Sequence, residues 1–206
     1  MTRYFNTEGS CNPKEHYMVK LDNRLERIKR LLVERKKYFV INRGRQYGKT
    51  TTLRALEKYL MDEYIVLSLD FQQLGTKDFA DEATFSDAFA DIMIRAFHIN
   101  NTDDSEELLK PLSGIRAEGS IGLKDLFVRL SDVCRNSPRP MVLMIDEVDS
   151  ASNNQVFVDF LAQLRSYYLY RDKMPIFHSV ILAGVYSIKN LKLKLRQESE
   201  HQYNSP

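Results

Sequence analysis

The chain has 206 residues, and its 30 Lys and Arg side chains nearly balance its 28 Asp and Glu side chains, so the formal net charge is +2. Hydrophobic residues make up 43% of the sequence, which excludes a disordered chain, because disorder requires low hydrophobicity together with high net charge. The sequence pI of about 8.4 also argues against a domain built mainly to hold nucleic acid, since such domains combine a pI above about 9 with clustered basic residues. At roughly 100–200 residues per domain, this length allows one substantial hydrophobic core.

The cysteine and histidine content limits the compartment and the metal chemistry. Cys11 and Cys134 lie far apart and lack Cys-x-x-Cys spacing, which indicates a reducing compartment and no structural zinc. The four histidines are scattered singly and do not indicate a metal cluster. Residues 1–10 contain no apolar segment typical of a signal peptide, and no stretch approaches the roughly 18 apolar residues of a membrane-spanning helix. We therefore expect a cytoplasmic protein without a membrane partner.

The apolar pattern predicts helices and strands in alternation. In chain order we expect a helix at residues 23–37, a strand at 38–41, a helix at 52–61, a strand at 64–71, helices at 83–99 and 123–136, a strand at 141–145, a helix at 155–172 and a strand at 180–185. Residues 100–122 contain Pro111 and three glycines and predict a loop or a set of short turns. The strands are unbroken apolar runs, which is typical of strands covered on both faces. The sequence therefore predicts an α/β fold with three αβα layers and a central, mainly parallel sheet.

Three segments are expected along the chain. Residues 1–20 have no regular pattern and predict an irregular lead-in, residues 21–195 form the core, and residues 196–206 are a polar tail. At the end of the core, residues 191–196 alternate Leu with Lys or Arg, which predicts a short half-exposed strand.

A phosphate-binding pattern follows the first predicted strand and opens the next helix. The pattern G-x-x-x-x-G-K-[ST] is satisfied at Gly48-Lys49-Thr50, but its first position holds Arg43, with the glycine displaced to Gly44. Successive backbone N–H groups in such a loop bind anionic oxygens, and the following helix adds its positive dipole end. We expect the phosphate-binding residues to be Arg43, Gly44, Arg45, Gln46, Tyr47, Gly48, Lys49, Thr50 and Thr51.

Two loop side chains have defined roles in this chemistry. Lys49 is expected to contact the β- and γ-phosphates as a point charge and to act in catalysis, and the Thr50 hydroxyl is expected to bind Mg²⁺. Thr51 lies one position further into the helix, where it can contact the α-phosphate. An accidental Gly-Lys-Thr at a helix start is the alternative, because Thr and Gly are common there.

Two adjacent acids, Asp146 and Glu147, follow the predicted strand at 141–145. Ligands of open parallel sheets lie beyond the carboxyl ends of the strands, so these acids should face the same crevice as the loop. We expect Asp146 to hold Mg²⁺, usually through water, and Glu147 to orient and deprotonate an attacking water. Asp149 in the same turn fits the alternative of a polar loop start, but the two motifs together favour nucleotide chemistry.

A weaker candidate follows the fourth predicted strand. Ser187, with Tyr186 as second choice, places a hydroxyl where it can sense the γ-phosphate or hold the attacking water, so Ser187 joins the candidate catalytic residues. Ordinary turn chemistry at a strand end explains this pair equally well.

These motifs together resemble those of a known family. Arg-Gly-Arg-Gln-Tyr-Gly-Lys-Thr-Thr-Thr-Leu at 43–53 and Met-Val-Leu-Met-Ile-Asp-Glu-Val-Asp at 141–149 resemble P-loop ATPases of the additional-strand, catalytic-glutamate division. Within this division the chain resembles bacterial AAA-like ATPases related to the STAND signal-transduction group, and residues 4–9 and 17–19 are similar to the segment before the first helix in that group. The resemblance covers residues 4–195.

The resemblance implies a P-loop NTPase fold, ATP and Mg²⁺ as ligands, and slow ATP hydrolysis in a nucleotide-driven switch or motor core. It also implies an effector domain or a second copy of the chain as partner. Such families place a fifth strand, a helical lid and an effector region after the fourth strand. Nothing after residues 191–196 predicts a helical lid, so we expect an ATPase core alone or a truncated product, in which incomplete closure slows hydrolysis.

The resemblance also raises the question of a catalytic arginine and a base-stacking residue. Arg165 and Arg171 are candidates for an arginine that serves a neighbouring subunit, with solvation at the surface as the alternative. Tyr4 or Tyr17 can stack on adenine, and packing in the core explains either equally well.

Two other functions are compatible with the sequence. A P-loop small-molecule kinase would share the sheet and the loop, although the arginine-rich lid typical of kinases is not evident. A non-catalytic nucleotide or DNA interaction module is suggested by the basic stretches at 24–37 and 189–196. A GTPase is disfavoured, because the sequence contains no Asn-Lys-x-Asp segment.

Overall fold

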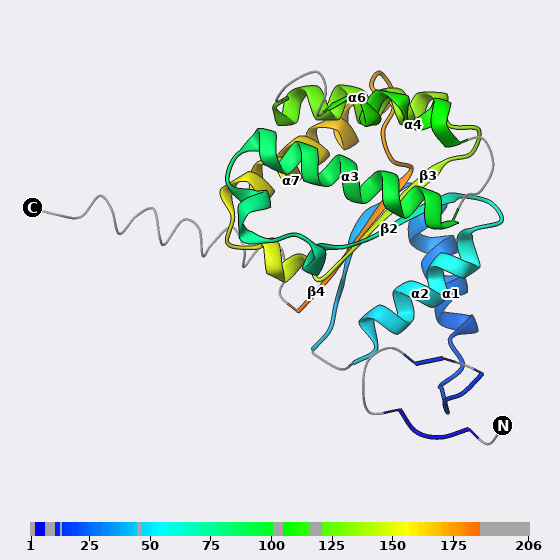
Figure 1. Cartoon of the computed structure of the whole chain (residues 1–206). Helices are drawn as coiled ribbons and strands as arrows, with labels where there is room; N and C mark the ends of the chain where they lie inside the picture. The colour runs from blue at the N-terminus through cyan, green and yellow to red at the C-terminus, as the bar shows by residue number, and fades with distance from the viewer. Residues whose placement is uncertain are drawn as a thin grey trace, which may run out of the picture.

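The structure of the chain, a computed structural model, describes residues 3–6, 11–12, 14–44, 47–100, 105–115 and 121–185 (Figure 1). The α-helices named here are α1 (Asp22–Ile28), α2 (Lys49–Leu60), α3 (Glu82–Asn100), α4 (Ser105–Ser113), α6 (Leu123–Asn136) and α7 (Gln155–Leu169). The strands are β1 (Tyr38–Asn42), β2 (Ile65–Asp70), β3 (Met141–Asp146) and β4 (Ser179–Gly184). Short helical segments are the π-helix η1 (Lys29–Val33) and the 3₁₀ turns η2 (Phe71–Gln73), η3 (Thr76–Phe79) and η4 (Val148–Ala151).

The four strands form one parallel sheet in the order β1-β4-β3-β2. Strand β4 therefore lies between β1 and β3, and the register places Ile41 beside Ala183 and Asp70 beside Asp146. Because the strands are parallel, all four carboxyl ends meet at one edge of the sheet. The prediction of a parallel sheet built from these four strands is confirmed.

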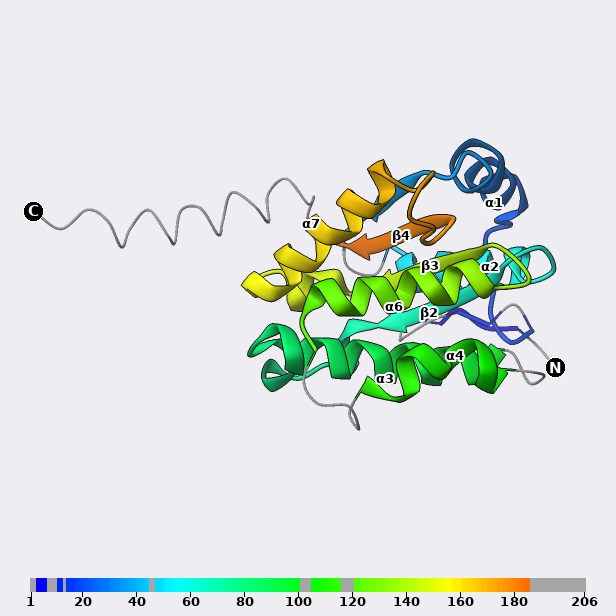
Figure 2. The same ribbon diagram turned by 90° about the horizontal axis from the view of Figure 1, so that it is seen from above.

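Helices cover both faces of the sheet, as Figures 1 and 2 show. Helices α1 and α2 pack on one face, where Ile181 and Ala183 of β4 contribute to the core. Helices α3, α4, α6 and α7 pack on the other face, where Val180 and Leu182 contribute. Since successive residues of a strand point to opposite faces, both sets must be apolar, which explains the unbroken apolar runs.

Aromatic rings fill the core between the sheet and α3, α6 and α7. Phe160 of α7 lies at its centre, with ring centroids 4.8 Å from Phe89, 5.3 Å from Phe85 and 5.4 Å from Phe127. These rings meet at tilted or edge-to-face angles, the arrangements that aromatic pairs prefer. The larger of the two cores thus holds α7, which follows the acidic residues of β3, in a fixed position.

The prediction of a loop over residues 100–122 is wrong in part, because this stretch contains α4. Leu109 and Leu112 are buried in the core against α3 and α6. Pro111 lies inside the helix, where it removes one backbone donor. The carbonyl of Pro111 accepts a hydrogen bond from the Arg129 guanidinium at 2.9 Å. Burial of the two leucines outweighs the unfavourable helix propensity of proline, which the composition of the stretch does not reveal.

Three helix boundaries also differ from the prediction by three residues or more, among them the end of α7, which lies at Leu169 and not at residue 172. The helix expected at 23–37 is α1 followed by the π-helix η1, and it ends before Lys36, which has a φ of 55°. The helix expected to begin at residue 52 begins at Lys49, directly after Gly48. No helix in the described part of the chain is long and apolar enough to cross a membrane.

Candidate functional site

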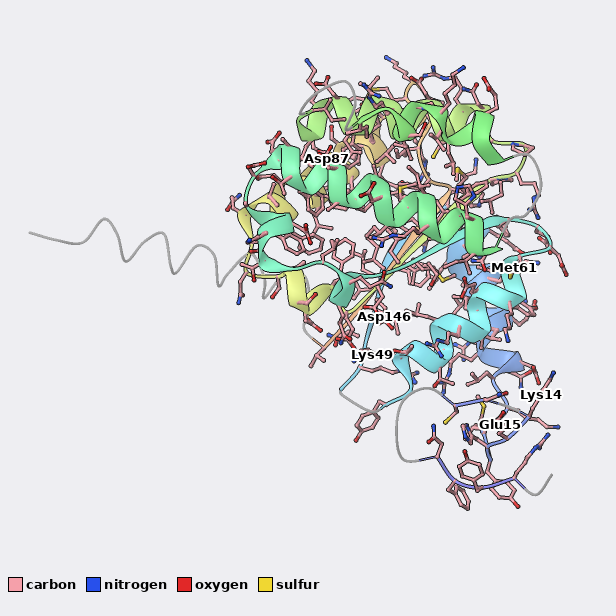
Figure 3. All side chains as sticks on the ribbon, in the orientation of Figure 1. Lys14, Glu15, Lys49, Met61, Asp87 and Asp146 are labelled. Carbon is pink, nitrogen blue, oxygen red and sulfur yellow. The ribbon has the colours of Figure 1, made fainter. Side chains whose placement is uncertain are left out.

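The two sequence motifs lie at the same edge of the sheet. The loop residues Arg43 and Gly44 follow β1, Gly48 precedes α2, and Asp146 is the last residue of β3. Figure 3 shows the side chains of Lys49 and Asp146 at this carboxyl edge, between α2 and the end of the sheet. Because β4 separates β1 from β3, the two motifs face each other across the end of one intervening strand.

Gly48 forms the sharp turn between the loop and α2. Its φ of 71° and ψ of 31° are left-handed, a conformation that glycine adopts without steric penalty. The backbone N–H of Thr52 donates to the Gly48 carbonyl at 2.9 Å, and the Thr52 hydroxyl donates to the same oxygen at 2.8 Å. The helix therefore starts abruptly at Lys49, so the N–H groups of its first turn, which have no intrahelical partner, point toward the loop.

The position where the phosphate-loop pattern expects a glycine is occupied by Arg43 without a strained backbone. Among the described residues, a positive φ occurs outside glycine only at Lys36 and Glu147. The N–H of Arg43 donates to the carbonyl of Gly184 at 3.3 Å, so Arg43 extends the pairing of β1 with β4. Because the chain is still extended at this residue, a side chain is tolerated there.

Lys49, the first residue of α2, is buried, with only 6% of its surface exposed. Its Nζ donates a hydrogen bond to the carbonyl oxygen of Arg43 at 3.3 Å. The ammonium group therefore points back across the loop, where an anion bound by the backbone would meet it.

Thr50 and Asp146 are in direct contact. Thr50 Oγ1 donates to Asp146 Oδ2 at 2.7 Å, and the backbone N–H of Glu147 donates to Asp146 Oδ1 at 2.9 Å. Both carboxylate oxygens of Asp146 therefore accept a hydrogen bond, and Asp146 is only 8% exposed. A hydroxyl and a carboxylate are oxygen donors of the kind that Mg²⁺ prefers, so this pair fits the predicted metal.

Thr50 and Asp146 would fill only part of the coordination shell of a metal ion. The part of the chain described here holds no cluster of three or more His, Cys, Asp or Glu side chains suited to a metal ion. Mg²⁺ is commonly held by one or two protein ligands, water and the phosphates of a substrate. The Thr50–Asp146 pair is suited to that mode and not to a metal cage.

Glu147 has an unusual backbone and a shifted pKa. Its φ of 53° and ψ of 41° are left-handed, and non-glycine residues in this region concentrate at functional sites. Burial raises the pKa of the Glu147 carboxyl, and the negative charges of Asp146, Asp149 and Asp70 raise it further, while Lys49 acts in the opposite direction. A carboxylate with a raised pKa is a better proton acceptor than an ordinary one.

Sequence reasoning missed Asp70, which ends β2. Asp70 pairs in register with Asp146, and both line a cavity of about 230 Å³ that also includes Thr50, Arg54 and Glu57. An acid at the carboxyl end of an apolar run was the signal that identified Asp146, and the same signal is present at Asp70.

The lead-in contacts the start of α2. The backbone N–H of Cys11 donates to Thr51 Oγ1 at 3.3 Å, so the Thr51 hydroxyl faces the lead-in. A cavity of about 390 Å³ lies at this contact; its lining comprises Cys11, Asn12, Met18, Thr51, Arg54, Ala55, Glu57 and Lys58. Neither candidate stacking residue is part of this lining: the ring of Tyr17 packs on Phe5 and that of Tyr4 on His16.

The two candidate arginines lie away from the loop of their own chain. Arg171 follows α7, stacks on the ring of Tyr168 at 4.5 Å and donates to the carbonyl of Lys36, which precedes β1. Arg171 therefore sits at the amino edge of the sheet, opposite the site. Arg165 lines an apolar cavity between α7 and β1.

Several predicted residues lie outside the part of the chain that the structure describes. These are the loop residues Arg45 and Gln46, the hydroxyl candidates Tyr186 and Ser187, and residues 189–206 with the predicted strand and tail. Their roles remain predictions.

The fold and the paired motifs agree with a match between the chain and a protein-family model. No curated protein and no solved structure matches the chain. A protein-family model described as an AAA-like domain matches residues 8–199, and the chain therefore belongs to this AAA-like family of P-loop ATPases.

Proposed function

We propose that this chain binds ATP with Mg²⁺ at the loop before α2, hydrolyses it slowly, and serves as a nucleotide-driven switch or motor core. The observation that carries the proposal is the 2.7 Å hydrogen bond between Thr50 and Asp146, which joins the phosphate-loop helix to the acid of β3. The position of β4 between β1 and β3, together with Glu147 directly after Asp146, supports placement in the additional-strand, catalytic-glutamate division.

The phosphates are held by backbone and lysine. The N–H groups of the first turn of α2 and the loop backbone bind phosphate oxygens, with Gly48 allowing the chain to turn sharply around them. Lys49 exchanges the carbonyl of Arg43 for the β- and γ-phosphates, which are stronger acceptors because they are charged. Arg43, Gly44, Arg45, Gln46 and Tyr47 complete the loop.

The metal-holding groups are Thr50 and Asp146. Thr50 and Asp146 would hold Mg²⁺, and the ion would supply positive charge that offsets the charge developing on the transferred phosphoryl group. Thr50 supplies a hydroxyl oxygen and Asp146 a carboxylate, directly or through water. Asp70 adds negative charge on the β2 side of this pair.

Glu147 acts on the attacking water. Its carboxylate accepts a proton from the water as the water oxygen bonds to the γ-phosphorus and the bond from that phosphorus to the β,γ-bridging oxygen breaks, with ADP leaving. Burial, which raises the pKa of this carboxyl, favours its role as proton acceptor. Ser187 is retained as a candidate for holding the water or sensing the γ-phosphate. The cavity between the lead-in and α2 is suited to the nucleoside, because it borders Thr51, one residue beyond the metal ligand.

Binding and turnover of ATP in three variants test the proposal. Lys49→Ala is expected to weaken ATP binding by roughly a hundredfold, because it removes a charged partner from the phosphates. Glu147→Gln is expected to bind ATP normally and to release phosphate at least about a hundred times more slowly. Lys124→Ala, which changes an exposed lysine on α6, serves as the control. Undiminished ATP binding by Lys49→Ala contradicts the proposal.

A small-molecule kinase is the second candidate, and one feature favours it. The cavity beside Asp146 is lined by Asp70, Arg54 and Glu57, polar groups that can hold an acceptor next to the metal pair. Phosphate release from ATP in the absence of any acceptor distinguishes a hydrolase from a kinase. The DNA-binding alternative loses part of its support, because Lys29 in the basic stretch pairs with Glu63.

A further inference from the structure

One peptide group connects the phosphate loop with the acidic turn after β3. The carbonyl of Gly184 accepts a hydrogen bond from the Arg43 N–H at 3.3 Å, and the N–H of Val185, in the same peptide, donates to Oδ2 of Asp149. The loop and the turn thus hold opposite sides of a single planar unit, which moves as a rigid body.

Close packing fixes this peptide against the acidic turn. A Cβ atom at Gly184 would lie 2.9 Å from Asp149 Oδ2 and 2.9 Å from Val148 Cγ2, so any other residue here would have to displace one of these side chains. Val148 is itself buried in the core, and glycine therefore lets this peptide pack closely against the turn.

The acidic turn is stiff enough to carry a displacement from Asp149 to Glu147. The N–H and hydroxyl of Ser150 both donate to the Glu147 carbonyl, at 3.0 and 2.8 Å, and the same hydroxyl lies 3.3 Å from the carbonyl of Phe71. Asp149 lies between Glu147 and this anchor, within the 3₁₀ turn η4. A shift of the Asp149 carboxylate consequently changes the backbone that orients Glu147.

Arg43, at the loop end of this connection, responds to an anion bound in the phosphate loop. Nζ of Lys49 donates to the carbonyl of Arg43, the residue whose N–H holds Gly184. An anion that draws Lys49 away changes the hydrogen bonding of Arg43. The path then runs through Arg43 and the Gly184–Val185 peptide to Asp149.

We propose that Asp149 is a positioning residue that transmits occupancy of the phosphate loop to Glu147 through the Gly184–Val185 peptide. This inference rests on the proposed ATPase function and names a residue outside its set of phosphate and metal contacts. Asp149 then governs the rate of hydrolysis and leaves the affinity for ATP nearly unchanged.

Kinetics of Asp149 variants separate this role from a purely structural one. Asp149→Ala is expected to lower kcat roughly ten- to a hundredfold, because small misplacements of a catalytic group have effects of that size, while the Kd for ATP stays within about twofold. Asp149→Asn keeps an acceptor oxygen for Val185 and is expected to recover kcat to within about threefold of the wild type. Asp62→Ala, at an exposed aspartate before β2, is the matched control.

Two kinetic results would overturn the inference. A general loss of structure in Asp149→Ala would raise Kd and lower kcat together and would not be recovered by Asp149→Asn. That pattern, or a wild-type kcat in Asp149→Ala, overturns the inference. If the wild type binds ATP as well as Glu147→Gln does but shows no turnover, the hydrolytic part of the proposed function fails. The amide signals then test the role of Asp149.

Backbone amide signals report the coupling directly. With Mg²⁺ and a non-hydrolysable ATP analogue, the amide signals of Gly48, Val185 and Ser150 are expected to shift in the wild type. The Ser150 N–H donates to the Glu147 carbonyl, whereas the Glu147 N–H donates to the metal-holding Asp146 and responds to Mg²⁺ directly. In Asp149→Ala the Gly48 and Val185 signals are expected to shift and the Ser150 signal is not. A Ser150 signal that shifts equally in Asp149→Ala overturns the inference, and a wild-type Gly48 signal that does not respond overturns the proposed function and the inference with it.

Discussion

At the scale of single residues, the contact between Thr50 and Asp146 links the two motifs and yields a direct prediction. Thr50→Ala removes the hydroxyl that donates to Asp146 at 2.7 Å and that is expected to bind Mg²⁺. We expect the Mg²⁺-dependent part of ATP affinity to fall by about ten- to a hundredfold, since a contact to a charged group is worth about 1.5–3 kcal/mol. Competition against a fluorescent ATP analogue, with Mg²⁺ and with a chelator, measures this change.

Two further variants sharpen the Thr50 experiment. Thr50→Ser keeps the hydroxyl and is expected to retain Mg²⁺-dependent affinity, whereas Thr76→Ala changes an exposed threonine in η3 and is expected to have no effect. Equal Mg²⁺ dependence in Thr50→Ala and the wild type would show that this hydroxyl is not a metal ligand.

Residues whose chemistry lies in a short contiguous segment could be identified from the sequence. Lys49 and Thr50 lie in one loop-helix junction, and Asp146 follows an apolar run. Asp70 was missed although it also ends an apolar run, because the strand predicted at 64–71 continued past it to Phe71. Its place beside Asp146 depends on the register between β2 and β3, which no local pattern contains. The contact between Asp149 and Val185 joins two strand ends and is equally absent from local sequence.

At the scale of secondary-structure elements, α7 is held by the ring of Phe160, which is fully buried among other aromatic rings. Phe160→Ala is expected to lower the free energy of unfolding by about 3–5 kcal/mol, through lost burial and the cavity left behind. Phe5→Ala changes a ring that is 79% exposed and is expected to change this free energy by less than about 0.5 kcal/mol. Denaturant unfolding compares the two, and equal losses would contradict the placement of α7.

Strands were predicted better than helix boundaries, for a physical reason. A strand buried on both faces must be apolar throughout, so β3 and β4 stand out as unbroken runs. The helix α4 carries Pro111 near its end, and its stability comes from leucines that meet α3 and α6, the helices named before and after it in the chain. Tertiary packing of this kind overrides local propensity.

At the scale of the whole molecule, the amino edge of the sheet contains a histidine that links stability to pH. Burial lowers the pKa of His178 below its ordinary value of 6.5, and the positive charges of Lys36 and Arg171 lower it further, while the backbone of Val33 acts in the opposite direction. The unfolded chain therefore binds a proton at a higher pH than the folded protein does. This contribution to stability is present above about pH 6.5 and is lost as the pH falls through the lowered pKa.

Replacing His178 tests this linkage. The free energy of unfolding of the wild type is expected to fall between about pH 7.5 and pH 5.5, and His178→Gln is expected to reduce that fall, because glutamine does not titrate. His98→Gln, at an exposed position near the end of α3, is the control and is expected to leave the fall unchanged. Identical pH profiles in His178→Gln and wild type would contradict the assignment.

The arrangement of the whole molecule places every proposed contact at the carboxyl edge of one parallel sheet, with α2 on one side and the acidic turn on the other. A crystal structure with Mg²⁺ and a non-hydrolysable ATP analogue tests this most directly. The account predicts that Lys49 Nζ contacts the β- and γ-phosphates, that Thr50 Oγ1 coordinates the metal, and that Asp146 holds it directly or through one water. A nucleotide bound elsewhere, or a metal without Thr50 and Asp146 in its surroundings, would contradict it.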